Sequence, residues 1–285
     1  MSELCQRDSM SDAWLETLRV VNKQQDGKMV HVLTAASQPE LPEDVEIRAA
    51  LDRILTPSLR RPKLQSVATI ANTIFPYALY PDPGLCWSPE SGADNTAVDE
   101  AAERLYKNYA TIFANLGRVH SENRKGTYFS RMMSWPGKDM GGLNQLEKRI
   151  EHLRSMKRSG KTAFNASDLA MGDPASDDGG DLGLSIYASS DNRTRSFPCL
   201  VHVDIGVYQN KLNLLGVYRH QYLIQKGYGN MLGLHRLQKF LAQQSGYGVG
   251  ELAVQATFAT AEHDVFGKQN VDRLAVVKLQ EELAF

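Results

Sequence analysis

Cysteine is scarce in this sequence, and long apolar runs are missing. The three cysteines are Cys5, Cys86 and Cys199, and no Cys-x-x-Cys pair occurs. So sparse and odd a set excludes a disulfide-stapled scaffold and a zinc site built on paired cysteines. The polar stretch 1–12 lacks a signal-peptide core, and no apolar run approaches the roughly 18 residues of a membrane span. We therefore expect a cytoplasmic protein without a metal centre and without a membrane partner.

The sequence also lacks an excess of either basic or acidic residues. The chain carries 32 basic and 33 acidic residues, which gives a net charge of -1. Binding a nucleic-acid polymer requires a basic surface that neutralises many phosphates, so we expect no such partner. A local basic pocket for one phosphate remains compatible with this balance. Apolar residues make up 42% of the 285 residues, which suffices for a sizeable core.

Apolar spacing along the chain alternates between helical and strand-like periods. Loops are predicted over 76–95, which is rich in proline, and over the small, acidic stretch 172–180. The predicted helices cover 11–22, with Ser11 or Asp12 as N-cap, and 43–55, 97–116, 143–156 and 228–245. The predicted strands cover 29–35, 127–133, 182–188, 199–209, 211–221 and 252–259. This mixture predicts an α+β fold with a central, mostly mixed β-sheet covered on one side by helices.

Four landmarks in the C-terminal half stand at fixed spacings. Phe197-Pro198-Cys199 opens the block, and Arg219 follows 20 positions after the cysteine. Asn230 comes another 11 positions on, and Ala242-Gln243-Gln244 begins another 12 positions later. This order and spacing resemble the nucleophile-bearing core of the thymidylate synthases.

Two weaker matches lie upstream and extend the resemblance to about residues 66 to 265. The segment Gly126 to Arg131 and the pair Trp135-Pro136 resemble a second stretch of the family. Residues 71–75 faintly resemble the helix that bears the family's catalytic glutamate. The resemblance implies one thymidylate-synthase-like domain over 1–285, with 1–60 as a candidate divergent addition, and a homodimer.

The resemblance implies a chemistry for Cys199. A thiolate that adds to C6 of a pyrimidine makes C5 nucleophilic, and C5 then attacks a one-carbon donor, which in the family is 5,10-methylenetetrahydrofolate. Arg219 would bind the nucleotide phosphate and favour the thiolate. Asn230 would read the edge of the base, because its amide carries both a donor and an acceptor.

Several family residues are exchanged in this chain. His220 replaces the polar residue after the phosphate-binding arginine, and Tyr222 replaces the aspartate that meets the folate. Lys226 to Asn230, which includes Tyr228, stands where the family has Gly-x-Pro-Phe-Asn. Asn72 falls in the place of the catalytic glutamate. Phe258 to Glu262 lacks the histidine and tyrosine of the family's sugar-binding motif.

Candidate site residues follow from these matches and exchanges. Cys199 and His220 are the predicted catalytic residues; the histidine is a candidate general base or phosphate contact, with a structural role as the alternative. The family's pair of phosphate-binding arginines has no counterpart, and its candidate replacements are Arg124, Arg131, Arg193 and Arg195. The predicted substrate-binding residues are Arg219, Asn230, Tyr222, Tyr228 and Arg131.

Two functions of different classes fit this pattern. The first is a transferase that adds a methyl or hydroxymethyl group to a pyrimidine or related nucleotide through a Cys199 adduct. The second is a non-catalytic nucleotide-binding sensor or assembly subunit with the same fold. Retention of Cys199, Arg219 and Asn230 in register favours the enzyme, whereas the exchanged polar residues favour the binding protein.

Overall fold

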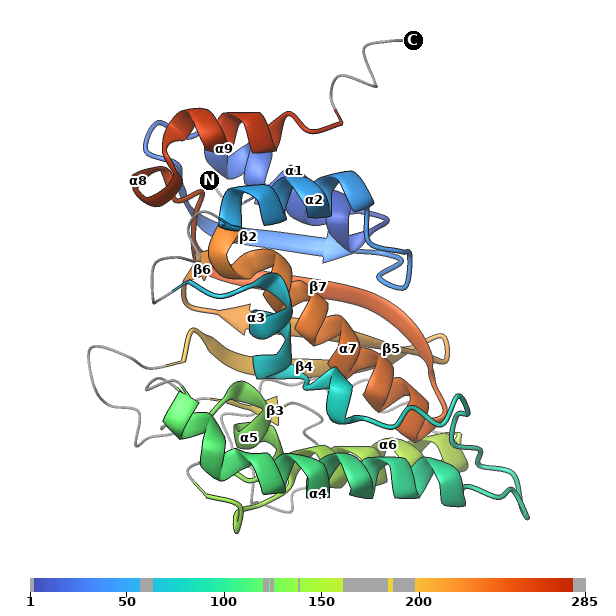
Figure 1. The fold of residues 1–285 in the computed structure, drawn as a ribbon. Coiled ribbons are helices and arrows are strands. Elements are labelled where there is room, and N and C mark those ends of the chain that lie inside the picture. Colours follow the sequence, from blue (N-terminus) through green and yellow to red (C-terminus); the bar gives the residue numbers. More distant parts are fainter. Residues whose placement is uncertain are drawn as a thin grey trace. The chain divides into compact units, whose positions relative to one another are not determined.

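Helices and strands succeed one another along the whole described chain. The computed structural model describes residues 3–56, 64–119, 123, 126–137, 139–160, 184–186 and 198–278. The helices in Figure 1 are α1 (Met10–Asn22), α2 (Val45–Leu55), α3 (Val67–Ile74), α4 (Thr96–Val119), α5 (Tyr128–Met133), α6 (Gln145–Ser159), α7 (Tyr228–Ser245), α8 (His263–Phe266) and α9 (Lys268–Ala275). A 3-10 turn, η2 (Tyr77–Leu79), and a π-helical segment, η5 (Leu223–Gly227), complete the helical elements.

The strands form a mixed, open sheet. They are β1 (Glu3–Arg7), β2 (Lys28–Ala36), β3 (Leu184–Ser185), β4 (Leu200–Tyr208), β5 (Lys211–Tyr218), β6 (Gln221–Tyr222) and β7 (Gly248–Thr260). Hydrogen-bonded neighbours follow the order β1-β2-β7-β5-β4-β3, and β6 pairs with β7. The β1–β2 and β6–β7 pairs are parallel, whereas β2–β7 and β3–β4 are antiparallel. The predicted α+β class with a mixed sheet is confirmed.

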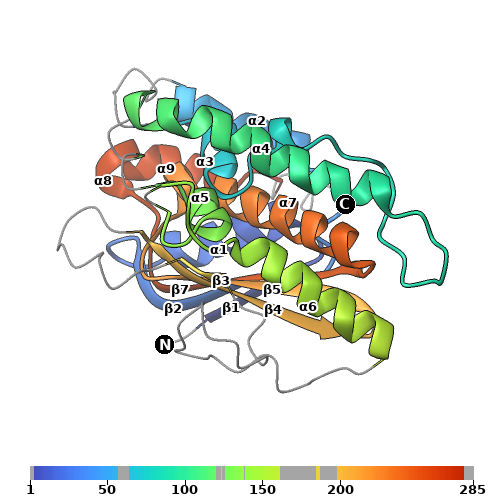
Figure 2. The ribbon, with the colours of Figure 1, turned by 90° about the horizontal axis from the view of Figure 1, so that it is seen from below.

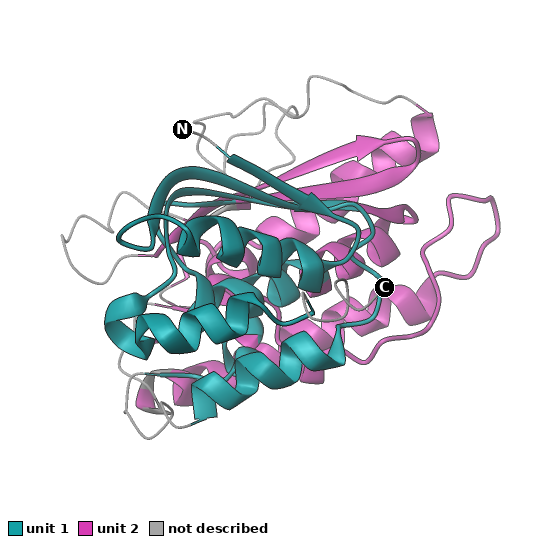
Figure 3. Cartoon of the chain, turned by 90° about the horizontal axis from the view of Figure 1, so that it is seen from above, with its two compact units in different colours: residues 1–71, 217–235, 251–285 teal, residues 72–216, 236–250 magenta. Residues whose placement is uncertain are grey.

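The chain divides into two compact units, each assembled from distant segments. The first comprises residues 1–71, 217–235 and 251–285, and the second comprises residues 72–216 and 236–250. The described helices of each unit lie on one face of that unit's strands (Figure 2 and Figure 3). The predicted single domain over 1–285 stays a prediction.

The first unit is built around the β1–α1–β2 connection. Two parallel strands need a crossover between them, and α1 supplies it while packing against both. The apolar stripe of α1 is almost fully buried: Trp14, Leu15, Leu18 and Val21. Strand β1 was not predicted, because its five residues carry no clear alternation and are held in place by pairing with β2.

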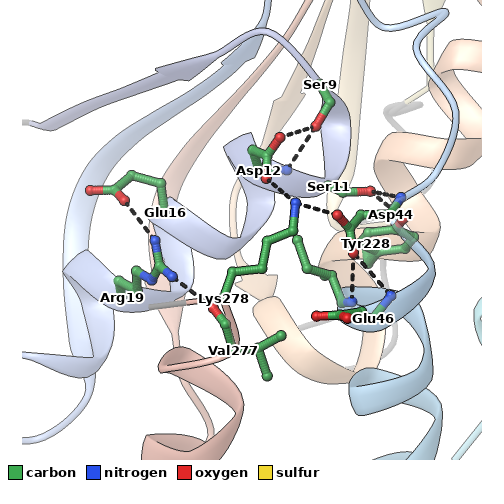
Figure 4. Close-up of polar contacts among 11 residues, drawn as sticks. Ser9, Ser11, Asp12, Glu16, Arg19, Asp44, Glu46, Tyr228, Val277 and Lys278 are labelled. Carbon is green, nitrogen blue, oxygen red and sulfur yellow. Dashed lines mark hydrogen bonds and ion pairs between the residues drawn. The ribbon is translucent and has the colours of Figure 1, made fainter. Parts of the chain in front are cut away.

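A polar network ties the starts of α1 and α2 together (Figure 4). The N-cap of α1 is Ser9, whose Oγ accepts the backbone N–H of Asp12 at 3.1 Å, so the predicted caps Ser11 and Asp12 were two and three positions too late. Asp44 caps α2 and accepts the backbone N–H groups of the second and third residues of that helix. Lys278 forms ion pairs with both Asp12 and Asp44. Each carboxylate thus lies where a helix N-terminus favours negative charge.

The second unit has an aromatic core. The rings of Phe75 and Phe129 meet edge to face with centroids 5.8 Å apart, and Tyr80 meets Phe240 in the same way at 5.2 Å. Tyr109 from α4 packs on Phe129 at 4.7 Å. Edge-to-face contacts of this kind add to the stabilisation from burial alone. The core therefore joins α4, α5, the C-terminal part of α7 and the segment that follows α3 within this unit.

The segment 127–133 was predicted as a strand, and this prediction was wrong. It forms helix α5, which begins after Thr127, whose side chain accepts the backbone N–H of Ser130 at 3.2 Å. Phe129, Met132 and Met133 stand three and four positions apart and are all buried. A local N-cap and helical spacing outweigh the strand propensity of individual residues here.

Other predicted elements are confirmed with small shifts of their ends. The predicted strands 199–209 and 211–221 correspond to β4 and β5, and both Gln209 and Asn210 between them adopt positive φ, of 49° and 61°. That backbone suits a tight hairpin, as the asparagine suggested. Helix α7 has its predicted bounds, whereas β7 is longer than predicted. The predicted loop 172–180 and most of the predicted strand 182–188 lie outside the described residues.

Candidate functional site

Cys199 lies in the second unit, immediately before β4. It is half-buried, whereas Cys5 is buried and Cys86 is exposed, and no disulfide joins the three. Pro198 precedes it and lies outside the strand, so the cysteine stands at the point where the chain enters the sheet. Phe197, which opened the matched block, lies outside the described residues. The thiol is thus placed at a strand end and is accessible in part.

Tyr128, the first residue of α5, is a neighbour of Cys199 that was not among the predicted site residues. Burial raises the pKa of the Tyr128 phenol, and the charge of an ionised Cys199 raises it further. Hydrogen bonds from the backbone of Leu200 and Cys199 act in the opposite direction, as does the charge of Arg131. The phenol therefore lies against the backbone that carries the thiol. Tyr128 belongs to the matched stretch Gly126 to Arg131, and this match was the one sequence signal that could have predicted its place near Cys199.

Arg131 is buried beside this tyrosine. Its exposed fraction is 2%, and its Nη1 donates to the backbone oxygen of Ile186 at 2.9 Å. Its own carbonyl accepts a hydrogen bond from Gln145 Nε2 at 2.9 Å. Gly137, with a φ of 85°, lies so close that a β-carbon there would fall 2.5 Å from the Arg131 Cγ. The guanidinium is therefore fixed in place, and its positive charge acts on Tyr128. The alternative arginines, Arg124, Arg193 and Arg195, lie outside the described residues.

The first unit holds a second group of predicted residues, at the end of β5 and in β6. The rings of His220 and Tyr222 are stacked with centroids 4.2 Å apart, and Phe258 from β7 meets His220 edge to face at 5.0 Å. Arg219 is half-buried next to His220. Among the described residues, the buried Nε2 of His220 has no hydrogen-bond partner.

The environment of His220 keeps its imidazole neutral at pH 7. Burial lowers the pKa of His220 below its usual 6.5, and the charges of Lys226 and Lys28 lower it further. A neutral imidazole can accept a proton, so the ring retains the property that a general base needs. The surroundings of His220 were not predicted from the sequence: the rings of Tyr222 and Phe258 both contact it.

Tyr228 and Asn230 lie in the first turn of α7. Asn230 is 4% exposed. The hydroxyl of Tyr228 forms a buried hydrogen bond with Ser11 Oγ at 2.9 Å (Figure 4). Its ring meets Trp14 edge to face. Burial raises the pKa of Tyr228, and the Ser11 bond lowers it in part. The tyrosine hydroxyl is thus engaged by α1.

The predicted residues fall into groups that belong to different units. Cys199, Tyr128 and Arg131 form one group in the second unit. In the first unit, His220 and Tyr222 are in direct contact, with Arg219 adjacent in the chain, and the start of α7 carries the remaining two: Tyr228 and Asn230.

Within the part of the chain that the structure describes, no group of three or more histidine, cysteine, aspartate or glutamate side chains has the arrangement of a metal site. None of the described helices is both long and apolar enough to cross a bilayer. No family model matches the chain, and no curated protein matches it.

Proposed function

We propose that the chain is a thymidylate-synthase-like transferase that adds a one-carbon group to a pyrimidine or related nucleotide through a Cys199 adduct. The observation that carries the proposal is the placement of Cys199. It is a half-buried cysteine at the entry of β4, whose backbone contacts the phenol of Tyr128, and the buried guanidinium of Arg131 acts on that phenol. Positive charge favours the thiolate, which is the reactive form. The spacing from Cys199 through Arg219 to Asn230 supports the same proposal.

The chemical steps require one nucleophile and one proton acceptor. The thiolate adds to C6 of the base and the electron pair moves to C5. C5 then bonds to the one-carbon group while the bond from that group to its donor breaks, and the donor leaves with the bonding electron pair. Loss of the C5 proton and cleavage of the C6–S bond then release the modified base and the thiolate. By sequence position alone, His220 is the candidate proton acceptor and Asn230 the candidate residue for recognising the base edge.

The one-carbon donor is proposed only as a chemical class. In the thymidylate synthases an aspartate at the position of Tyr222 meets the folate. Here the Tyr222 ring stacks on His220 and offers no carboxylate. The residues present do not fit 5,10-methylenetetrahydrofolate as the family holds it, and no step is derived through this cofactor.

A second candidate function is a nucleotide-binding sensor or assembly subunit without turnover. Two of the predicted ligand-binding side chains already have partners within the protein, which favours this alternative. Arg131 donates to the Ile186 carbonyl, and the Tyr228 hydroxyl bonds Ser11. Such internal contacts stabilise a pocket but leave fewer groups for a substrate.

Assembly and location are proposed with the function. A cytoplasmic homodimer is expected from the resemblance to the thymidylate synthases, and the absence of a disulfide among the three cysteines is compatible with it. Light scattering of the purified protein distinguishes a dimer from a monomer directly.

Intact-mass spectrometry tests the proposed chemistry. The protein is incubated with 5-fluorinated uracil and cytosine nucleotides, with and without methylenetetrahydrofolate. We expect a covalent adduct that is lost in Cys199→Ser and retained in Cys86→Ser, the matched control at the exposed cysteine. Binding of a nucleotide without an adduct, unchanged by Cys199→Ser, would contradict the enzyme and support the second candidate.

A further inference from the structure

Glu262 follows β7 and is held in an unusual backbone conformation. Its φ is 59° and its ψ is 42°, in the left-handed region, and its exposed fraction is 1%. Residues with a β-carbon adopt this region rarely, and they persist there when surrounding contacts fix them. Here the backbone N–H of Glu262 donates to Thr260 Oγ1 at 3.1 Å. The carboxyl group is thereby directed into the first unit.

The carboxylate accepts three hydrogen bonds from η5. Oε2 accepts the backbone N–H groups of Ile224 and Gln225 at 2.8 and 3.0 Å. Oε1 accepts the side-chain amide of Gln225 at 2.5 Å. The first N–H groups of a helical segment have no partners within that segment, so Glu262 acts as their external cap from a distant part of the chain.

The segment that Glu262 caps leads directly into the candidate site. η5 ends at Gly227, and α7 begins at Tyr228 with Asn230 in its first turn. Single π-helical turns are rare and occur often at functional sites. Trp14 holds η5 from the other side, because its Nε1 donates to the Leu223 carbonyl at 2.8 Å and its ring lies against Gly227.

The charge of this carboxyl group changes near neutrality. Burial raises the pKa of Glu262 to about 7, hydrogen bonds from Gln225 and Ile224 oppose this, and the charge of Asp264 raises it further. Titratable side chains near Glu262 in the chain or on the paired strands are His263 on α8, Lys226 on η5, Lys28 on β2, and His220 and Tyr222 at β6. The other elements that adjoin η5 add those of α1, α2 and the start of α7: Asp12, Glu16, Arg19, Glu46, Arg48, Asp52, Arg53 and Tyr228.

We infer that Glu262 is a positioning residue for the start of α7, which fixes η5 when ionised and rearranges it when protonated. A proton on Oε1 turns that atom from an acceptor into a donor. The Gln225 amide must then rotate to present its oxygen, and the two backbone bonds to Oε2 lose the strength that the charge gives them. The position of η5, and with it that of Asn230, therefore depends on pH.

The variant Glu262→Gln imitates the protonated state. Its amide nitrogen can donate to the Gln225 oxygen, and its carbonyl can accept from the backbone, as a protonated carboxyl group does. An effect of Glu262 on nucleotide binding rests on the proposed function, because it assumes that Asn230 contacts a base. The pH-dependent rearrangement of η5 does not rest on that function.

Trp14 provides the readout. The full chain is labelled with 5-fluorotryptophan, and its three resonances are assigned with Trp87→Phe and Trp135→Phe. Fluorine spectra are recorded from about pH 5.5 to about pH 8.5, which spans the range where a carboxyl group of raised pKa titrates. We expect the Trp14 resonance to shift with a midpoint near 7 in the wild type. In Glu262→Gln it should stay at its low-pH position throughout, while His263→Gln and His220→Gln should retain the shift.

A second variant keeps the inference testable if Glu262→Gln folds poorly. Gln225→Leu removes one donor to the carboxylate, so the midpoint should move upward. A Trp14 resonance that does not change with pH would overturn the inference, as would a titration that survives in Glu262→Gln or an unchanged midpoint in Gln225→Leu. If the fluorine titration behaves as expected but no nucleotide binds, the proposed function fails and Glu262 keeps its role.

Discussion

The surroundings of Cys199 and the start of α7 use their polar side chains differently. At α7, the polar groups are engaged within the first unit: Tyr228 bonds Ser11, Glu262 caps η5, and Trp14 bonds Leu223. At Cys199 the residue is half-buried, and Arg131, whose charge acts on the neighbouring Tyr128, donates to the Ile186 carbonyl. The polar side chains of the α7 region thus bond one another, whereas Cys199 is a half-buried cysteine that the proposed function makes the nucleophile.

The largest expected effect tests how much the α7 region depends on its internal contacts. Trp14→Ala removes a fully buried indole and the bond to Leu223, and we expect it to lower the free energy of unfolding by about 3 to 5 kcal/mol. Urea denaturation followed by circular dichroism measures this change. Phe240→Ala, at an equally buried ring of the second unit, should cost a similar amount. A loss of less than about 1 kcal/mol for Trp14→Ala would refute the packing described for η5.

The next effect concerns Arg131 in the second unit. Arg131→Met leaves the Ile186 carbonyl without this donor, and we expect a loss of about 1 to 3 kcal/mol in the free energy of unfolding. The matched control is Arg104→Met on α4, whose side chain is 64% exposed and pairs with Glu100. That change should stay within about 0.5 kcal/mol, as is usual for surface substitutions. Equal effects of the two substitutions would show that Arg131 is not held by its carbonyl contact.

A smaller effect is expected at Ser11. Ser11→Ala removes the partner of the Tyr228 hydroxyl and the acceptor of the Asp44 backbone N–H, at a cost of about 1 to 2 kcal/mol. Tyr228→Phe removes the same hydroxyl contact from the other side. The double variant should therefore cost less than the sum of the two single variants. Strict additivity would mean that the Ser11–Tyr228 bond contributes nothing to stability.

The smallest effect concerns the pH dependence of the network around Asp44. Burial acts to raise the pKa of Asp44, but hydrogen bonds from Lys278 and the Ile47 backbone outweigh it and lower this pKa below 3.8. Its contribution to stability is therefore present above about pH 3.8 and is lost as the pH falls through the lower, folded-state pKa. Asp44→Asn keeps a capping side chain and removes the charge, so the acid-induced loss should shrink. An acid titration of stability identical to that of the wild type would contradict this assignment.

Much of the fold could be predicted because its signals are local. Helix α7 and the β4–β5 hairpin follow from apolar spacing and from an asparagine that tolerates positive φ. Strand β1 could not be predicted, because its pairing with β2 decides its conformation. Helix α5 was misread, although Thr127 and the spacing of Phe129 and Met132 carried the helical signal.

The candidate site was less predictable than the fold. The resemblance pointed to Cys199 and to the stretch that contains Tyr128, and the structure places these two in contact. It did not show that Tyr228 is engaged by Ser11. In the sequence, position 262 stood out only because it lacks the tyrosine of the family's sugar-binding motif. The role of Glu262 could not be predicted, because it depends on a left-handed backbone and on η5, and neither has a signature in the sequence.

The reactivity of Cys199 relative to Cys86 tests the central claim most directly. Both cysteines are present in the native protein, and peptide mapping after limited treatment with iodoacetamide at neutral pH gives both alkylation rates in one sample. Exposure alone predicts faster alkylation at the exposed Cys86. The proposed thiolate near Arg131 predicts faster alkylation at the half-buried Cys199, and a decrease of that rate in Arg131→Met. A Cys199 that reacts more slowly than Cys86, with no change in Arg131→Met, would contradict its assignment as the nucleophile.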